Sequence, residues 1–395
     1  MKIRGSYGSL GNQVMDDLGN FPYLATYGTN SSYNYLINGS KPVIVKAPGL
    51  VAPDFTWETV TQMDFGFDAS FLNNRLTGTF DWYRRNTKDM LVAGATLPAT
   101  LGASVPKSNS ADMKTIGWEL SLGWNDRLEN GFSYWVKGVL SDYQATITKY
   151  AGNDAGFYSQ SDGDGKYYVG QKIGEIWGYH SNGLFQSDDE AATIDQSELY
   201  AGKWDAGDVK YEDLDNDGKI TKGEETIYNP GDKSIIGNKT PRYQFGITVG
   251  FDYKNFDFEM FWQGTGKRDY MLSGAQFWGF TSQWDVPYTP ALDYWTETNT
   301  DAYFPRPGWQ NGGNRVTSDR YLQSAAYGRL KNLTVGYTIP KNLTTKWGIS
   351  RLRLYVTGEN LLTITPLNDA FDPETLGGMT YPINRKVAIG LNLTL

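Results

Sequence analysis

Apolar and polar residues alternate along much of this chain with a period of two residues. The clearest run covers residues 57–71, where Met63, Phe65, Phe67 and Phe71 occupy alternate positions and mostly polar residues lie between them. Successive side chains of a β-strand point to opposite faces. The pattern therefore predicts a strand with one apolar and one polar face.

The same rhythm returns at intervals to the end of the chain. It predicts further strands near residues 2–8, 76–82, 118–125, 132–141, 243–253, 256–263, 332–339, 352–359 and 387–395. This makes about ten strands of roughly ten residues each, a length that spans a bilayer when the strand is tilted. We therefore expect an all-β fold.

The connections between these strands alternate between long and short. The long ones are residues 9–56, 93–112, 151–241, 271–324 and 364–383, and the short ones lie near 73–75, 126–131, 254–255 and 340–351. A transmembrane antiparallel β-barrel sorts its connections in this way, with short turns in the periplasm and long extracellular loops. The polar face then lines a wet lumen, and the apolar face meets outer-membrane lipid. A soluble β-sandwich also has alternating strands and stays open as an alternative.

A sheet of about ten strands that does not close on itself would leave two edge strands exposed. Exposed strand edges are not tolerated in lipid, so we expect the C-terminal portion of a larger closed barrel. The start of the chain agrees, because Met1 leads into a strand-like segment with no signal peptide. A cytoplasmic protein would also lack that signal.

Composition removes several function classes. The formal net charge of -8 disfavours nucleic acid as a partner. The chain has no Cys, which excludes disulfides, thiolate metal sites and a Cys nucleophile, and its single His180 argues against a catalytic triad. No apolar run approaches the roughly 20 residues of a membrane helix.

An acidic stretch at residues 213–224 has the spacing of a twelve-residue calcium loop, with Gly218 at the tight turn. The predicted ligands are the carboxylates of Asp213, Asp215, Asp217 and Glu224, the carbonyl of Lys219 and a water held by Thr221. The flanks do not have a helical pattern, so we expect calcium to stiffen the long connection 151–241 rather than to signal. An acidic surface turn that binds nothing is the alternative.

Aromatic residues are frequent in the long connections. Such side chains could stack on sugar rings or hold a partner protein, or they could pack into small cores that keep long loops folded. We select four as candidate contacts with substrate or partner: Trp278, Trp284, Tyr288 and Trp295.

Several longer stretches resemble the SusC/RagA family of TonB-dependent outer-membrane transporters. They include NRLTGTFDWY at residues 74–83, IIGNKTPRYQFG at 235–246, RLKNLTVGYTIP at 329–340 and LRLYVTGENL at 352–361. The resemblance extends over the whole chain. It departs at the end, where Leu395 replaces the usual final aromatic residue, and near residues 110–118.

The resemblance implies a 22-stranded barrel, of which residues 1–395 would form the C-terminal part. The plug domain and the TonB-contacting segment of such proteins would be absent from this chain. The resemblance also implies a SusD-like surface lipoprotein and TonB as partners, with an oligomeric nutrient, a glycan or else a peptide, as substrate.

We therefore expect a transporter of the Gram-negative outer membrane, not an enzyme. The alternative is a secreted, calcium-stabilised β-rich protein that binds or hydrolyses glycans. Lumen-facing carboxylates alone do not favour hydrolysis, because a glycosidase needs two of them at a set separation.

Overall fold

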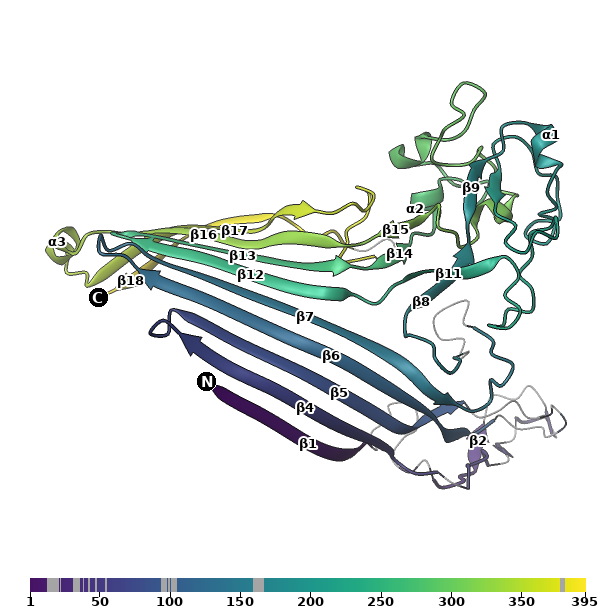
Figure 1. Ribbon diagram of the computed structural model, residues 1–395, viewed down its shortest axis with the longest axis horizontal. Coiled ribbons are helices and arrows are strands. Elements are labelled where there is room, and N and C mark those ends of the chain that lie inside the picture. Colours follow the sequence, from purple (N-terminus) through teal and green to yellow (C-terminus); the bar gives the residue numbers. More distant parts are fainter. Residues whose placement is uncertain are drawn as a thin grey trace.

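The computed structural model describes residues 1–12, 21, 23–30, 36–37, 39–41, 43–46, 48–53, 55–93, 98, 100, 105–158, 167–376 and 381–395. Its main feature is one sheet of ten antiparallel strands, which follow one another in chain order (Figure 1). The strands are β1 (Lys2–Asn12), β4 (Glu58–Phe71), β5 (Leu76–Ala93), β6 (Lys107–Arg127), β7 (Ser133–Tyr150), β12 (Arg242–Tyr253), β13 (Phe256–Lys267), β16 (Tyr327–Thr338), β17 (Arg351–Ile364) and β18 (Lys386–Thr394).

Smaller elements lie in the connections. The short strands are β2 (Gly28–Asn30), β3 (Ile44–Lys46), β8 (Glu175–Tyr179), β9 (Ser181–Leu184), β10 (Val209–Tyr211), β11 (Lys233–Asn238), β14 (Asp269–Met271) and β15 (Leu322–Ser324). The helices are α1 (Asp188–Ala191), α2 (Ala275–Trp278), α3 (Lys341–Thr344) and the 3-10 turns η2 (Thr289–Leu292), η3 (Gly312–Arg315) and η4 (Thr345–Trp347). None of the helices among the described residues is long and apolar enough to cross a membrane.

The register of the sheet collects apolar residues on one face and polar residues on the other. Phe80, Leu120, Leu140 and Phe245 are successive partners across β5, β6, β7 and β12. One residue along each strand, a polar row runs through the same strands: Asp81, Glu119, Ser141 and Gln244. The predicted two-faced strands are confirmed.

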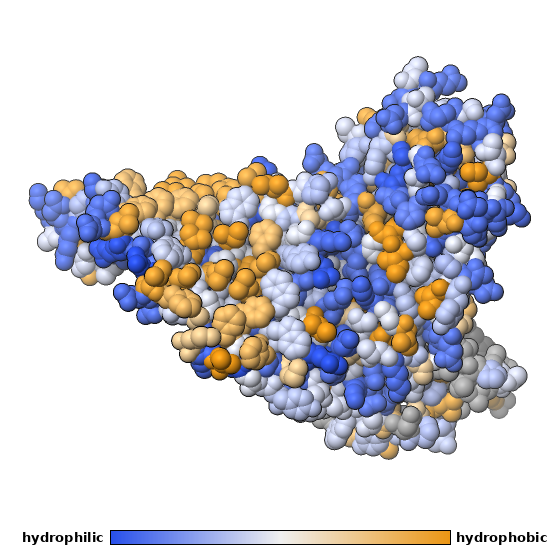
Figure 2. All heavy atoms as spheres, viewed as in Figure 1, coloured by the Kyte–Doolittle hydropathy of each residue, from blue (hydrophilic) through white to orange (hydrophobic). Residues whose placement is uncertain are grey.

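The apolar face is exposed, as expected for a surface that meets lipid. Phe65 on β4 is 51% exposed, and Val335 and Val356 on β16 and β17 are also exposed. Figure 2 shows apolar residues gathered in a band across the strands, with polar residues at both ends of the molecule. A soluble protein rarely exposes so large an apolar surface, so the sandwich alternative is not supported.

Charged residues on the opposite face are paired across strands. Nε of Arg4 on β1 lies 2.9 Å from a carboxylate oxygen of Asp68 on β4, and Arg4 also lies 2.7 Å from Asp81 on β5. Further along the sheet, Arg353 on β17 pairs with Asp257 on β13. The polar face thus carries ion pairs that join neighbouring strands or, for Arg4–Asp81 and Arg353–Asp257, reach across one intervening strand.

Long and short connections lie at opposite ends of the sheet, as predicted. In Figure 1 the short ones and both chain termini are on the left, whereas the folded long connections are on the right. Several strands run further towards the long connections than expected, and β5, β6 and β7 extend furthest, with 18, 21 and 18 residues. The first part of β6 is polar on both faces, so its pattern gave no sign of a strand.

Candidate functional site in the long connections

Three long connections fold together at one end of the sheet. We call their described residues the head: the links β7–β12, β13–β16 and β17–β18, which lie within 151–241, 268–326 and 365–385. They share one hydrophobic core. Its buried members are Tyr179, Leu184, Val209, Tyr211, Ile220, Leu272, Phe277, Trp278, Ala291, Phe304, Tyr321, Ala325, Leu367 and Leu376.

The four aromatic residues selected from the sequence do not form one surface. Trp278 is buried in the core of the head, where its ring contacts Tyr321 edge-on with centroids 4.5 Å apart. Trp295 is partly buried against the same core. Trp284 and Tyr288 are 83% and 47% exposed. Only these last two are free to meet a large partner.

The third connection also fastens the head to the polar face of the sheet. Arg329 on β16 is almost fully buried and lies 2.6 Å from Asp372 and 3.3 Å from Glu374. Lys331 lies 2.9 Å from the same Glu374. A guanidinium and an ammonium on the wall therefore hold the acidic turn of this connection in place.

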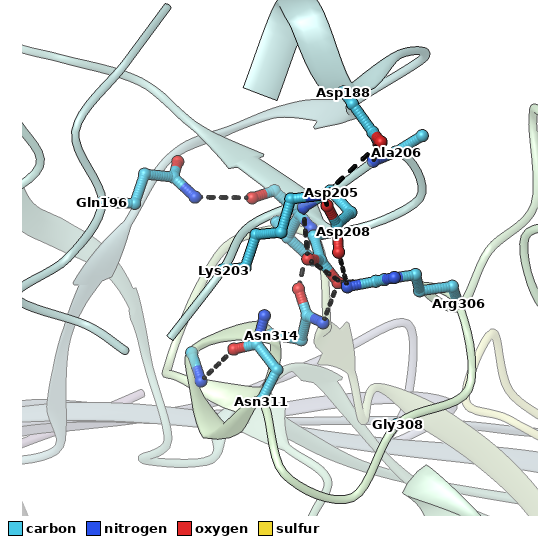
Figure 3. A network of polar contacts seen from close by, with 12 residues as sticks. Asp188, Gln196, Lys203, Asp205, Ala206, Asp208, Arg306, Gly308, Asn311 and Asn314 are labelled. Atoms are coloured by element: carbon cyan, nitrogen blue, oxygen red, sulfur yellow. Dashed lines mark hydrogen bonds and ion pairs between the residues drawn. The ribbon is translucent and has the colours of Figure 1, made fainter. Parts of the chain in front are cut away.

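A buried carboxylate joins the first two connections of the head (Figure 3). Asp208 is 1% exposed and accepts hydrogen bonds from Arg306 Nε at 3.0 Å and from the Asn314 amide at 2.8 Å. Arg306 also bonds Asp205 Oδ2 at 2.9 Å, and Lys203 pairs with Oδ1 of the same carboxylate. The Lys203 and Arg306 charges lower the pKa of Asp205 against the effect of its partial burial.

The single histidine also ties these two connections together. Nδ1 of His180 lies 2.7 Å from Asp319 Oδ2, and Nε2 lies 2.8 Å from Ser234 Oγ. The sequence gave no sign of this Ser-His-Asp chain. Three hydrogen-bonded side chains are not yet an active site, because acyl transfer also needs donors for the oxyanion. Ser234 sits within a strand ladder, opposite Gly178 of β8, which favours a structural role.

The acidic loop brings together a different set of carboxylates from the predicted one. Ligand oxygens of Asp213, Asp215 and Asp232 all lie within 4.8 Å of one another. Asp232 is fully buried, and its carboxylate accepts hydrogen bonds from the backbone N–H groups of Leu214 and Thr221, both at 2.7 Å. Asp232 was not among the predicted ligands.

The other predicted ligands lie around this group but are not part of it. Asp217 accepts a hydrogen bond from the N–H of Lys219 at 2.8 Å, while the carbonyl of Thr221 accepts one from Asp232 at 3.1 Å. Glu224 is exposed in the next turn, where its N–H bonds the carbonyl of Asn229 at 3.0 Å. Of the six predicted ligands, the cluster contains only Asp213 and Asp215.

The predicted tight turn is present in this loop. Gly218 has a φ of +83°, a left-handed conformation that favours glycine. The turn aims the Gly218 N–H at Asp213 Oδ2, 2.8 Å away. Partial desolvation of Asp213 opposes its ionisation, but hydrogen bonds from backbone N–H groups outweigh this effect and lower the pKa of Asp213. Desolvation and the neighbouring Asp217 raise the pKa of Asp215. Crowded oxygens of this kind suit a hard cation.

Comparison with known proteins identifies the family of the chain. Residues 1–361 match the family model described as TonB dependent receptor-like, beta-barrel. The chain belongs to the TonB-dependent receptor β-barrel family. The resemblance found in the sequence is thereby confirmed, and so are the barrel fold and the outer-membrane location, because proteins of this family reside in that membrane.

Two curated relatives cover nearly all of this chain. The TonB-dependent receptor P3 of Formosa agariphila is 30% identical over 429 residues, which include 99% of this chain and 39% of the relative. The TonB-dependent receptor SusC of Bacteroides thetaiotaomicron is 26% identical and covers 100% of this chain and 37% of its own length. The chain thus spans about two fifths of the length of these relatives.

Solved structures show the same fold. The structure of the RagAB peptide transporter superposes with a TM-score of 0.75 at 22% identity and covers 99% of this chain and 40% of its own. The RagAB peptide importer in its open-open state also gives 0.75. A ten-stranded sheet that ends at β1 and β18 is what a part of such a barrel would look like.

Proposed function

We propose that this TonB-dependent receptor imports an oligomeric nutrient across the outer membrane, by gated passage and without making or breaking a bond. The observation that carries the proposal is the family match over residues 1–361, supported by the apolar band on the sheet. In this proposal residues 1–395 are the C-terminal part of the barrel, and plug and TonB-contacting segments belong to the remainder of a longer protein. TonB would supply energy from the inner membrane.

The cargo class in this proposal is a glycan or a peptide. The likeness to SusC supports a transporter of the same kind, and the structurally similar RagAB is described as a peptide transporter. The secreted glycan-binding protein or glycoside hydrolase finds no support among these relatives, which are receptors and transporters.

A SusD-like surface lipoprotein is the proposed partner, seated over an extracellular head. Trp284, Val286 and Tyr288 expose 83%, 77% and 47% of their surfaces within one short stretch of the head. Neighbouring exposed apolar residues are a common mark of protein contact. We infer that this stretch contributes to the contact with the lipoprotein.

Calcium is the proposed cofactor of the 151–241 connection, with Asp213, Asp215 and Asp232 as ligands. Their carboxylate oxygens lie close together, and calcium takes six to eight oxygens, including backbone carbonyls and water. Its role would be to stiffen the connection.

Uptake in cells tests the proposal. Cells that lack this gene should lose uptake of one labelled oligomer, from a panel of oligosaccharides and peptides, and should regain it on complementation. Depletion of TonB should abolish the same uptake. If uptake of every oligomer continued unchanged without the gene, the import function would be wrong.

A further inference from the structure

A cavity of about 430 Å³ opens between the first two connections of the head. This volume is within the range of small-ligand sites in proteins. Gln186, Asp188 and Asp189 line it on one side, and Trp295, Glu297 and Thr300 on the other. Its walls therefore combine an indole ring, three carboxylates and neutral hydrogen-bonding groups.

The walls of the cavity are held in place by hydrogen bonds between the lining residues and by packing of the Trp295 ring. The Gln186 side-chain amide donates a hydrogen bond across the cavity to the carbonyl of Thr300 at 3.3 Å, and Asp188 accepts one from the N–H of Ala206 at 2.9 Å. The Trp295 ring packs against the α-carbon side of Gly207, where a Cβ atom would come within 2.4 Å of the ring. The site is therefore preformed, and binding of a ligand would not cost the free energy of ordering these side chains.

Two of the three carboxylates of the cavity, Asp189 and Glu297, are not neutralised by the nearby cations. Arg306 is bound to Asp205 and Asp208, and Lys203 pairs with Asp205 and only at 3.6 Å with Asp188. Among the described residues, Asp189 and Glu297 have no ion-pair partner, and both are exposed. The cavity thus presents negative charge next to an aromatic ring.

From this arrangement we propose that the cavity binds a basic side chain, arginine in preference to lysine, of a peptide cargo. This inference rests on the proposed import function and chooses between its two cargo classes. A guanidinium group is planar, stacks on aromatic faces and pairs with carboxylates through two parallel hydrogen bonds. A neutral sugar could stack on the indole of Trp295, but it would gain nothing from the charge of Asp189 and Glu297.

Equilibrium binding of defined peptides to the detergent-purified protein tests the inference. The probe is the pentapeptide Ala-Ala-Arg-Ala-Ala, compared with the same peptide carrying citrulline, which has nearly the shape of arginine without its charge. We expect the citrulline peptide to bind at least about tenfold more weakly. Affinity for the arginine peptide should fall as salt is raised, because the carboxylates are exposed.

Substitutions locate the site. Asp189→Asn and Glu297→Gln should each weaken arginine-peptide binding by about three- to fivefold, and the double variant by about tenfold. Glu129→Gln, at an exposed carboxylate in the short link between β6 and β7, should change nothing. Both variants should fold, because neither cavity carboxylate holds another residue in place. Heat-modifiable gel mobility checks that each of them does.

The inference is overturned if the citrulline peptide binds as tightly as the arginine peptide, if the double variant keeps wild-type affinity, or if only a neutral oligosaccharide binds. Uptake assays distinguish failure of the arginine site from failure of the import function. TonB-dependent uptake of another oligomer, without arginine-peptide binding, would leave the import function standing and remove the site. Binding of the arginine peptide without uptake of any oligomer would leave the site standing and remove the import function.

Discussion

At the scale of single residues, the head depends on a few buried polar groups that join separate connections. Asp208 is the clearest case, because it receives a guanidinium and an amide from residues about one hundred positions away. Nothing near Asp208 in the sequence indicates this role, since its partners are distant and no periodic pattern relates them. The alternation that predicts strands gives no information about such contacts.

We expect Asp208→Asn to destabilise the head by about 1–3 kcal/mol, because a buried donor loses its acceptor and Arg306 loses its buried counter-charge. Limited proteolysis should then cut the 151–241 connection faster than in the wild type. Asp301→Asn, at an exposed position in the same head, serves as the control. Equal cleavage of both variants would mean that the network contributes little.

Trp278 and Trp284 provide a matched pair of substitutions. Trp278→Ala should cost about 3–5 kcal/mol of head stability, because it removes a ring from the shared core. Trp284→Ala should change stability by less than about 0.5 kcal/mol, because the ring is exposed, yet it should reduce co-purification of the lipoprotein. Thermal melting followed by tryptophan fluorescence, together with pull-down, measures both. Loss of stability in Trp284→Ala would contradict the assignment.

At the scale of elements, the acidic loop differs from a helix-flanked calcium loop in how it closes. In the predicted spacing, the twelfth residue returns to the cation because a helix begins there. Here the chain makes further turns after Thr221, and Asp232 returns to pair with the backbone of Thr221 in both directions. The first half of the loop could therefore be predicted from its spacing, whereas the closing carboxylate could not.

Calcium should protect the 151–241 connection from trypsin, and chelation should remove that protection. Asp232→Asn should abolish the calcium effect, whereas Glu224→Gln, at an exposed carboxylate outside the cluster, should retain it. The stabilisation should increase with free calcium, as it does for any ligand that binds only the folded form. Identical digestion with and without calcium would exclude the site.

The ion pairs of the head predict a response to acid. Lys210 lies 2.8 Å from Glu190, and this contact lowers the pKa of Glu190; Lys203 and Arg306 lower that of Asp205. A carboxylate with a lowered pKa stabilises the fold above its ordinary pKa, and that contribution is lost as pH falls through the lowered value. We therefore expect the head to stay closed at neutral pH and to loosen below about pH 4.

Hydrogen–deuterium exchange of the head between pH 6 and pH 3 will follow this transition. In Lys210→Met the pKa of Glu190 returns towards its ordinary range, so this pair no longer stabilises the head at neutral pH and no longer adds to the loss of stability in acid. The head of the variant should therefore exchange faster than the wild type at pH 6, and its exchange should increase less between pH 6 and pH 3. An identical pH profile for the two proteins would argue against a role for this pair.

At the scale of the whole molecule, the organisation follows from the solvents on the two faces of the sheet. All ten predicted strands are present, because hydrocarbon on one side and water on the other impose a strict two-residue period. The pattern fades where β6 extends beyond the apolar band and both of its faces are polar. It gives no information on how the long connections fold, since they share a core assembled from three separate segments.

Two adjacent residues of β16 allow the apolar and the polar face of the sheet to be compared at the same depth in the membrane. Val335 lies on the exposed apolar face and Thr334 on the polar face, where it bonds Thr357 at 2.9 Å. Val335→Arg should cost about 2–4 kcal/mol if the residue lies near the bilayer midplane, because a charge then enters hydrocarbon. Thr334→Arg should cost much less, because its side chain stays in water. Unfolding in lipid vesicles measures both variants, and equal losses would mean that this face of the sheet does not meet lipid.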